Sequence, residues 1–149
     1  MISLFDKSQQ YIIAEATPTL SLQSDKVHAK GDALWLGATV VPKDTGACKL
    51  VVDLPVSQSS SVGTENNSAC ITPDLSQDER FKNKPFVTHE PFARFYARVP
   101  IRSSKGASIR SYCVLGNNPR EGIDDATLQF LKDMAITVMA HLEWARSGE

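Results

Sequence analysis

Two stretches near the middle of the sequence carry side chains that could bind a ligand. Before the turn at 103–106, apolar residues alternate with a polar set that includes Arg94, Tyr96 and Arg98. After the turn, a second alternating stretch carries Ser111 and Cys113. A period of two is typical of strands and places alternate side chains on one face. We therefore expect these five side chains to share one face of a two-stranded unit.

The turn length predicts which of these side chains face each other. A tight turn over 103–106 places Tyr96 opposite Cys113 and Arg98 opposite Ser111. Guanidinium and hydroxyl groups on one face suit an anionic or hydrogen-bonding ligand. In the simpler alternative, the arginines pair with local carboxylates or carbonyls and Cys113 is a core residue.

The proline-bracketed loop before these strands adds three further candidates. Phe86, His89 and Phe92 lie between Lys84 and Arg94, and we include all three in the predicted ligand-binding set. His89 could respond to pH near neutrality. Because loops are exposed, the alternative is that this histidine is simply solvated.

Metal and disulfide chemistry find little support in the sequence. His28, His89 and His141 are far apart, and no C-x-x-C or H-x-x-x-H pair occurs. We therefore predict no metal site and no catalytic residue. The three cysteines are odd in number and widely spaced, as in reduced intracellular proteins.

Composition limits the class of protein. With 149 residues, 42% hydrophobic and 22% charged, the chain is long enough for one domain with a real core. A net charge of −1 gives no field that would attract nucleic acid or an anionic membrane. No apolar run approaches a membrane span and no secretory signal is visible. We predict a single cytoplasmic domain over 1–149.

The elements that must position the candidates can be read in order. Residues 2–5 and 10–16 form a predicted hairpin, 17–31 a loop, and 33–41 either a strand or a buried loop. Residues 48–54 fit a short helix or a strand, and 55–68, almost entirely small and polar, form a predicted flexible insertion. A strand over 69–72 and one or two helical turns over 74–84 lead into the central stretch.

The last helix is the clearest element. Asp124 is an N-cap type, and Ile123 and Leu128 have the spacing of a hydrophobic staple. A core-facing stripe recurs every three or four residues: Leu128, Leu131, Met134, Ala135, Val138, Met139 and Leu142. A second apolar set lies off this stripe and predicts an interface with another helix or a second copy: Phe130, Ile136 and Trp144.

These residues resemble a GAF domain, in particular those of fungal hybrid histidine kinases. The resemblance is carried by ISLFD, QYIIAEAT, ITPDLSQDERFKNKPFVTHEPFARFYARVPI and GASIRSYCVLGNNPREGIDDATLQFLKDMA. The positions that match the family pattern are Asp74, Arg80, Phe81, Pro85, Val87, Glu90, Pro91, Arg94, Phe95, Tyr96, Ala97, Pro100, Gly106, Cys113, Val114, Pro119, Arg120, Glu121 and Leu128. Two positions depart from it: relatives often have glycine at Arg98 and at His89.

The resemblance implies an α+β fold of the GAF or PAS-like type. Its sheet would have five or six antiparallel strands, helices on one face and a loop-covered pocket on the other, and the usual N-terminal helix is missing. It implies a non-catalytic sensor or transmission module of a two-component protein that binds a small ligand or dimerises.

Family signatures for particular cofactors are incomplete, so the cofactor stays unknown. No cysteine is followed by the histidine of bilin-binding domains, and only Asn83-Lys84 matches the cyclic-nucleotide signature. Two alternatives remain: a free methionine-R-sulfoxide reductase, which requires clustered cysteines, and a structural dimerisation domain without a ligand.

Overall fold

A computed structural model describes residues 1–5, 8–18, 20, 33–42, 69–106 and 108–148. The predicted insertion at 55–68 and the segment 48–54 lie outside the described residues. The described strands are β1 (Ile2–Phe5), β2 (Gln9–Ala14), β3 (Thr39–Pro42), β4 (Cys70–Thr72), β5 (Phe95–Arg102) and β6 (Ser108–Gly116). The described helices are α2 (Pro85–Thr88) and α3 (Asp125–Ser147).

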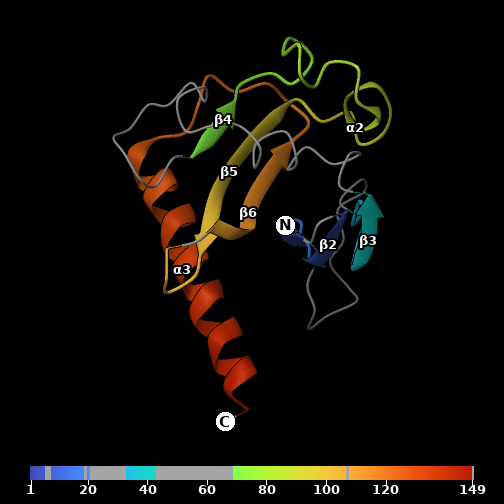
Figure 1. The fold of residues 1–149 in the computed structure, drawn as a ribbon. Helices are drawn as coiled ribbons and strands as arrows, with labels where there is room; N and C mark the ends of the chain where they lie inside the picture. Colours follow the sequence, from blue (N-terminus) through green and yellow to red (C-terminus); the bar gives the residue numbers. More distant parts are fainter. Residues whose placement is uncertain (6–7, 19, 21–32, 43–68, 107, 149) are drawn as a thin grey trace.

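The six strands form one antiparallel sheet in the order β3-β2-β1-β6-β5-β4 (Figure 1). The β1–β2 and β5–β6 hairpins supply four of these strands, and β1 joins the two hairpins by pairing with β6. The predicted fold class is confirmed: the protein is α+β, and its sheet is compatible with a GAF or PAS-like fold. No helix in the described ranges is long and apolar enough to cross a membrane.

One face of the sheet, here called the helix face, packs against α3. Alternate residues of β5 point toward the helix and are almost fully buried: Phe95, Ala97, Val99 and Ile101. From α3, Leu131 and Ala135 complete this core. The N-cap prediction is confirmed, because the Asp124 carboxylate accepts a hydrogen bond from the backbone N–H of Thr127 at 2.7 Å.

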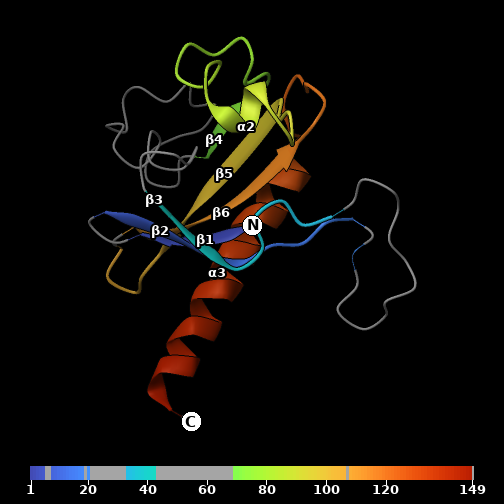
Figure 2. The ribbon, with the colours of Figure 1, turned by 90° about the vertical axis from the view of Figure 1, so that its right-hand side faces the viewer.

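The opposite face, here called the loop face, lies under residues 73–94. That segment contributes a second core cluster that packs on Tyr96 and Cys113 of the sheet: Leu75, Phe81, Phe86, Val87 and Ala93. Figure 2 shows α2 and its loop on one side of β5 and β6 and the helix α3 on the other. The strand β5 therefore lies between two separate cores.

The prediction of one or two helical turns over 74–84 is confirmed only as a single turn, in which the backbone N–H of Lys82 donates to the carbonyl of Asp78 at 2.8 Å. These residues form hydrogen-bonded turns, and the helix of this segment is α2, which begins at Pro85. The carboxylates of Asp74 and Asp78 each accept a bond from the backbone N–H two residues further on, at Ser76 and Arg80. Such side-chain bonds compete with helical ones. Proline fits a first helical turn, where its missing N–H has no partner to lose.

The predicted register of β5 and β6 is also wrong, by two residues. Tyr96 lies opposite Leu115, and Arg98 lies opposite Cys113. One residue of the shift arises at the turn, where Arg102 pairs with Ser108, one residue later than predicted, and the other arises from an irregularity in the pairing between Ile101 and Arg102. A shift of two preserves the face of each side chain. The prediction of a shared face is therefore confirmed for Tyr96, Arg98, Ser111 and Cys113, whereas Arg94 precedes β5.

The open question over residues 33–41 resolves into a loop followed by a strand. Residues 33–38 are irregular, and β3 begins at Thr39. The Glu15 carboxylate accepts hydrogen bonds from the backbone N–H groups of Trp35 (2.6 Å), Leu36 (2.9 Å) and Gly37 (2.7 Å). Gly37 has φ +64°, which favours glycine. These donors are consequently not used in a strand ladder.

Candidate functional site

A row of three side chains crosses the loop face. Arg98 of β5 is paired with Cys70 of β4 on one side and with Cys113 of β6 on the other. Strand pairing places directly opposite residues on the same face. All three are buried, and Arg98 is only 6% exposed. The largely buried side chain of Arg98 therefore leaves the sheet between two cysteines.

Arg98 has no counter-ion in the described part of the chain. No carboxylate described there lies within ion-pair distance of it, and its Nε atom is buried without a hydrogen-bond partner. Buried charges are normally paired because removing them from water is costly. The position of Arg98 is therefore the most unusual electrostatic feature of this face.

Hydroxyl groups lie next to this row. Ser111 of β6 and Ser3 of β1 are fully buried, and their Oγ atoms are 3.0 Å apart. Ser111 is two residues from Cys113, so it is a diagonal neighbour of Arg98. Gln10 of β2 is also buried, and its Oε1 has no hydrogen-bond partner. The centre of the loop face is thus polar, whereas the end near Tyr96 is apolar.

Sequence reasoning missed Ser3 and Gln10. The available signal was a polar residue within each apolar strand of the first hairpin, at a position that alternates with apolar neighbours. The strand β1 brings Ser3 to the site only because it pairs with β6, over a hundred residues away. That long-range pairing has no local sequence signature.

The two described cysteines are poor candidates for redox catalysis. Burial raises the pKa of the Cys70 thiol, although the guanidinium groups of Arg80 and Arg98 act in the opposite direction. Cys70 and Cys113 lie on strands separated by β5. Two strand spacings amount to about 10 Å, which exceeds the reach of a disulfide. Cys48 lies outside the described residues.

The remaining predicted ligand residues occupy different environments. Phe86 is buried in the apolar cluster of the loop face, and Tyr96 is fully buried beside it. The guanidinium of Arg94 donates to the backbone carbonyls of Val87, Phe92 and Ala93. For Arg94 the simpler alternative therefore holds, because it closes its own loop.

His89 and Phe92 point toward solvent. His89 is exposed, and its Nδ1 is 2.8 Å from the Thr88 hydroxyl. The Phe92 side chain is 48% exposed, on a residue with φ +52°. The structure thus brings Phe86, Tyr96, Arg98, Ser111 and Cys113 together, while His89 and Phe92 lie at the rim of the loop.

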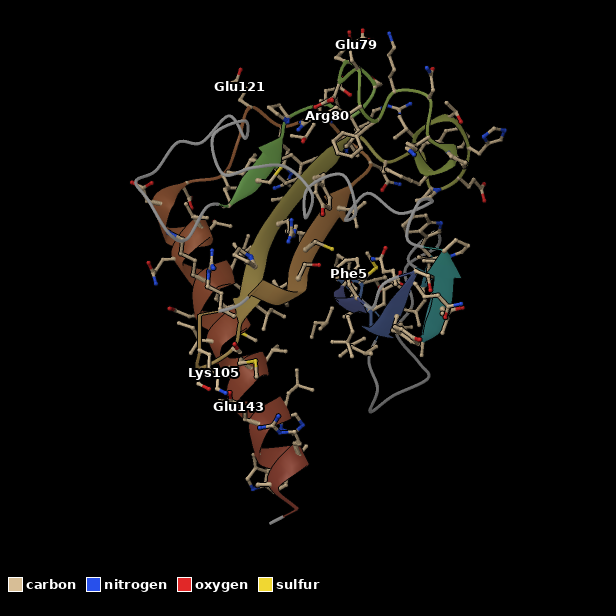
Figure 3. All side chains as sticks on the ribbon, in the orientation of Figure 1. Phe5, Glu79, Arg80, Lys105, Glu121 and Glu143 are labelled. Atoms are coloured by element: carbon tan, nitrogen blue, oxygen red, sulfur yellow. The ribbon has the colours of Figure 1, made fainter. Side chains whose placement is uncertain are left out.

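Charged side chains of the overlying loop are paired with one another. Arg80 binds Asp78 with two hydrogen bonds of 2.9 and 2.6 Å, and these lower the pKa of the Asp78 carboxyl. Glu79 pairs with Lys82 at 2.7 Å. Glu79 and Arg80 lie at the outer end of the loop in Figure 3. Within the described ranges, no group of three His, Cys, Asp or Glu side chains could hold a metal ion.

A cavity of about 200 Å³ opens where β6 extends past the start of β1. Its lining includes Glu15, Trp35, Pro91 and residues 113–115 of β6. The Trp35 ring lies 6.0 Å from the ring of Phe86, which links this cavity to the apolar cluster of the loop face. The sequence did not indicate this cavity, because it forms between segments that are distant along the chain.

The outer surface of α3 carries the predicted second apolar stripe. Phe130, Ile136 and Trp144 are 58%, 67% and 58% exposed. None of the three belongs to the core that Leu131 and Ala135 form with the sheet. In Figures 1 and 2 the C-terminal part of α3 extends beyond the sheet. The stripe therefore has no partner in the described part of the chain.

No family model matches the chain. Over 74 residues, which is 50% of its length, the chain is 35% identical to a protein of Pseudomonas aeruginosa named as a cyclic di-GMP phosphodiesterase. The matched region makes up 13% of that protein, so the chain is similar to a small part of it.

Proposed function

We propose that the chain is a non-catalytic sensory module of a signalling protein, in which the loop face binds a small ligand and α3 transmits the signal. The observation that carries the proposal is the position of β5. Tyr96 and Arg98 point to the loop face, and Ala97 and Val99 pack in the core with α3. Any shift of β5 on ligand binding therefore changes the surface on which α3 rests.

The comparison supports a role in signalling. The matched protein is named for the turnover of cyclic di-GMP, and the match covers only a small part of it. We assign this chain a regulatory role and no hydrolysis of its own. The finer proposal, a module of a fungal two-component histidine kinase, is supported only by the resemblance of residues 2–6, 10–17, 71–101 and 106–135.

The output in this proposal is pairing of α3 with a second copy or an adjacent helix of the parent protein. The exposed stripe of Phe130, Ile136 and Trp144 supports this, since exposed aromatic and aliphatic side chains in one patch mark interaction sites. Ligand binding would then shift the population of two arrangements of this helix pair.

Sedimentation tests the pairing. We expect the chain to self-associate at micromolar concentration and the Ile136→Glu variant to be monomeric. Ala145→Glu adds the same charge on an exposed part of α3 outside the stripe and should leave association unchanged. A wild-type chain that remains monomeric at all concentrations, also when fused to a second copy through a flexible linker, would contradict the proposed output.

Hydrolysis tests the non-catalytic part. The purified chain is incubated with cyclic di-GMP and, separately, with methionine sulfoxide and a thiol reductant. We expect no turnover of either substrate. Turnover of methionine sulfoxide that is lost in Cys113→Ser would favour the reductase alternative.

A further inference from the structure

The charge of Arg98 is the feature of the loop face that the described residues leave unbalanced. The residue is 6% exposed, and neither an ion pair nor a hydrogen bond to Nε is formed within the described ranges. Its strand neighbours Cys70 and Cys113 are thiols, which are weak hydrogen-bond acceptors. The direct neighbours of the guanidinium therefore supply no strong acceptor.

Nearby carboxylates are already in use. Asp74 accepts bonds from the backbone and hydroxyl of Ser76, and Asp78 is held by Arg80. Glu79 is paired with Lys82 on the outer side of the loop. These three carboxylates of the loop are therefore held by other partners.

The hydroxyl pair beside Arg98 has a proton to donate. Each serine carries one hydroxyl proton, and the single contact between Ser3 Oγ and Ser111 Oγ uses one of the two. The second proton has no acceptor among the described residues, and both side chains are fully buried. An Arg Nε–H and a serine O–H are thus available on one face, and both are donors.

We propose that this face binds an oxyanion, a carboxylate or phosphate group of a small molecule, with Arg98 as the binding residue and Ser111 as the second donor. The inference rests on the proposed ligand-binding function and names the chemical class of that ligand. Arginine binds carboxylate and phosphate through paired N–H groups, and burial strengthens such bonds. The bound oxyanion would supply the missing counter-charge.

The test is thermal unfolding of the full chain in chloride buffer with added inorganic phosphate or acetate. Wild type should show a saturable rise in Tm with at least one anion, by about 5–10 °C at a hundredfold excess over Kd. Arg98→Met should abolish this rise and should be as stable as wild type in chloride, because it removes an unpaired buried charge. Arg146→Met, at an exposed arginine of α3, is the matched control and should respond like wild type.

The two anions distinguish the two sources of the chemistry: a response to phosphate alone indicates a phosphate ester, and a response to acetate alone a carboxylate. An equal rise in Arg98→Met and wild type would overturn the proposal, since it would reflect general salt effects. If Arg98→Met does not fold, the NMR resonance of the Arg98 Nε–H group decides the question. This resonance is identified by its loss in Arg98→Lys. It should shift on titration of wild type with the anion, and an unchanged resonance overturns the proposal. This titration does not depend on self-association, so it can succeed where the proposed pairing of α3 fails.

Discussion

The two faces of α3 should differ sharply in their contribution to stability. Leu131 is 4% exposed and packs in the core of the helix face, whereas Ile136 is 67% exposed and lies outside that core. Truncation of a buried leucine to alanine removes its transfer free energy and leaves a cavity, at a cost of about 2–5 kcal/mol. We expect about 3 kcal/mol for Leu131→Ala and about 0.5 kcal/mol or less for Ile136→Ala, because alanine also favours the helix.

Urea denaturation followed by circular dichroism measures both values. The m-value should be the same for wild type and the two variants, so that the change in midpoint reports stability. For a chain of this length, the loss in Leu131→Ala corresponds to a decrease of about 6–12 °C in Tm. Both variants retain a helix-forming residue at the substituted position, so differences in helix propensity do not explain the contrast.

Equal losses of stability in the two variants would refute the assignment of the inner and outer faces. The measurement is best repeated at two protein concentrations. A loss in Ile136→Ala that appears only at the higher concentration means that the outer stripe is buried in a dimer, since association stabilises the folded state by mass action. A loss independent of concentration would mean that the chain itself covers the stripe.

Three further outcomes are expected. Hydrogen bonds lower the pKa values of Asp78 and Asp124 below the ordinary carboxyl value. The contribution of these two groups to stability is therefore present above about pH 4 and is lost as the pH falls through their pKa values in the folded protein. The variant Asp124→Asn keeps the cap without the charge, so on acid titration it should lose less stability than wild type. The thiols of Cys70 and Cys113 are buried, so iodoacetamide should leave both unmodified in the native protein and should modify both in denaturant. Peptide mass spectrometry measures the modification. Rapid labelling of Cys70 in the native protein would contradict the raised pKa of its thiol. Glu15→Ala removes the acceptor of three backbone N–H groups and should lower stability by about 1–2 kcal/mol. The control is Glu121→Ala, at an exposed glutamate, and its stability should stay near that of wild type. Equal stability of the two variants would show that water replaces the Glu15 carboxylate.

The sequence predicted the elements whose pattern is local. Alternation in 95–101 identified β5 and its two faces, and Asp124 identified the start of α3. The side chains of Asp74 and Asp78 were read as part of a helix, although their short carboxylates favour the turns that they form in the structure. The predicted register was wrong because the connection is one residue longer than expected and an irregularity in the pairing adds a second residue, and neither leaves a mark in the pattern.

The candidate site was predicted in part for the same reason. Period two placed Tyr96, Arg98, Ser111 and Cys113 on one face, and the structure confirms this grouping. The different environments of Arg94 and Arg98 could not be predicted. Each lies in the same alternating run, and only the folded loop brings three carbonyls to Arg94, whereas Arg98 Nε has no hydrogen-bond partner among the described residues.

The length of α3 gives the molecule a lever. The helix has 23 residues and is therefore about 35 Å long, and its contacts with the sheet core end near Met139. About 12 Å of helix extends beyond that fulcrum to Ser147. A tilt of about 5° at the packed half would displace the far end by about 1 Å, and each residue added in helical continuation would increase the displacement in proportion. A small change in the slope of β5 would thus be converted into a larger movement at the C-terminal end of α3.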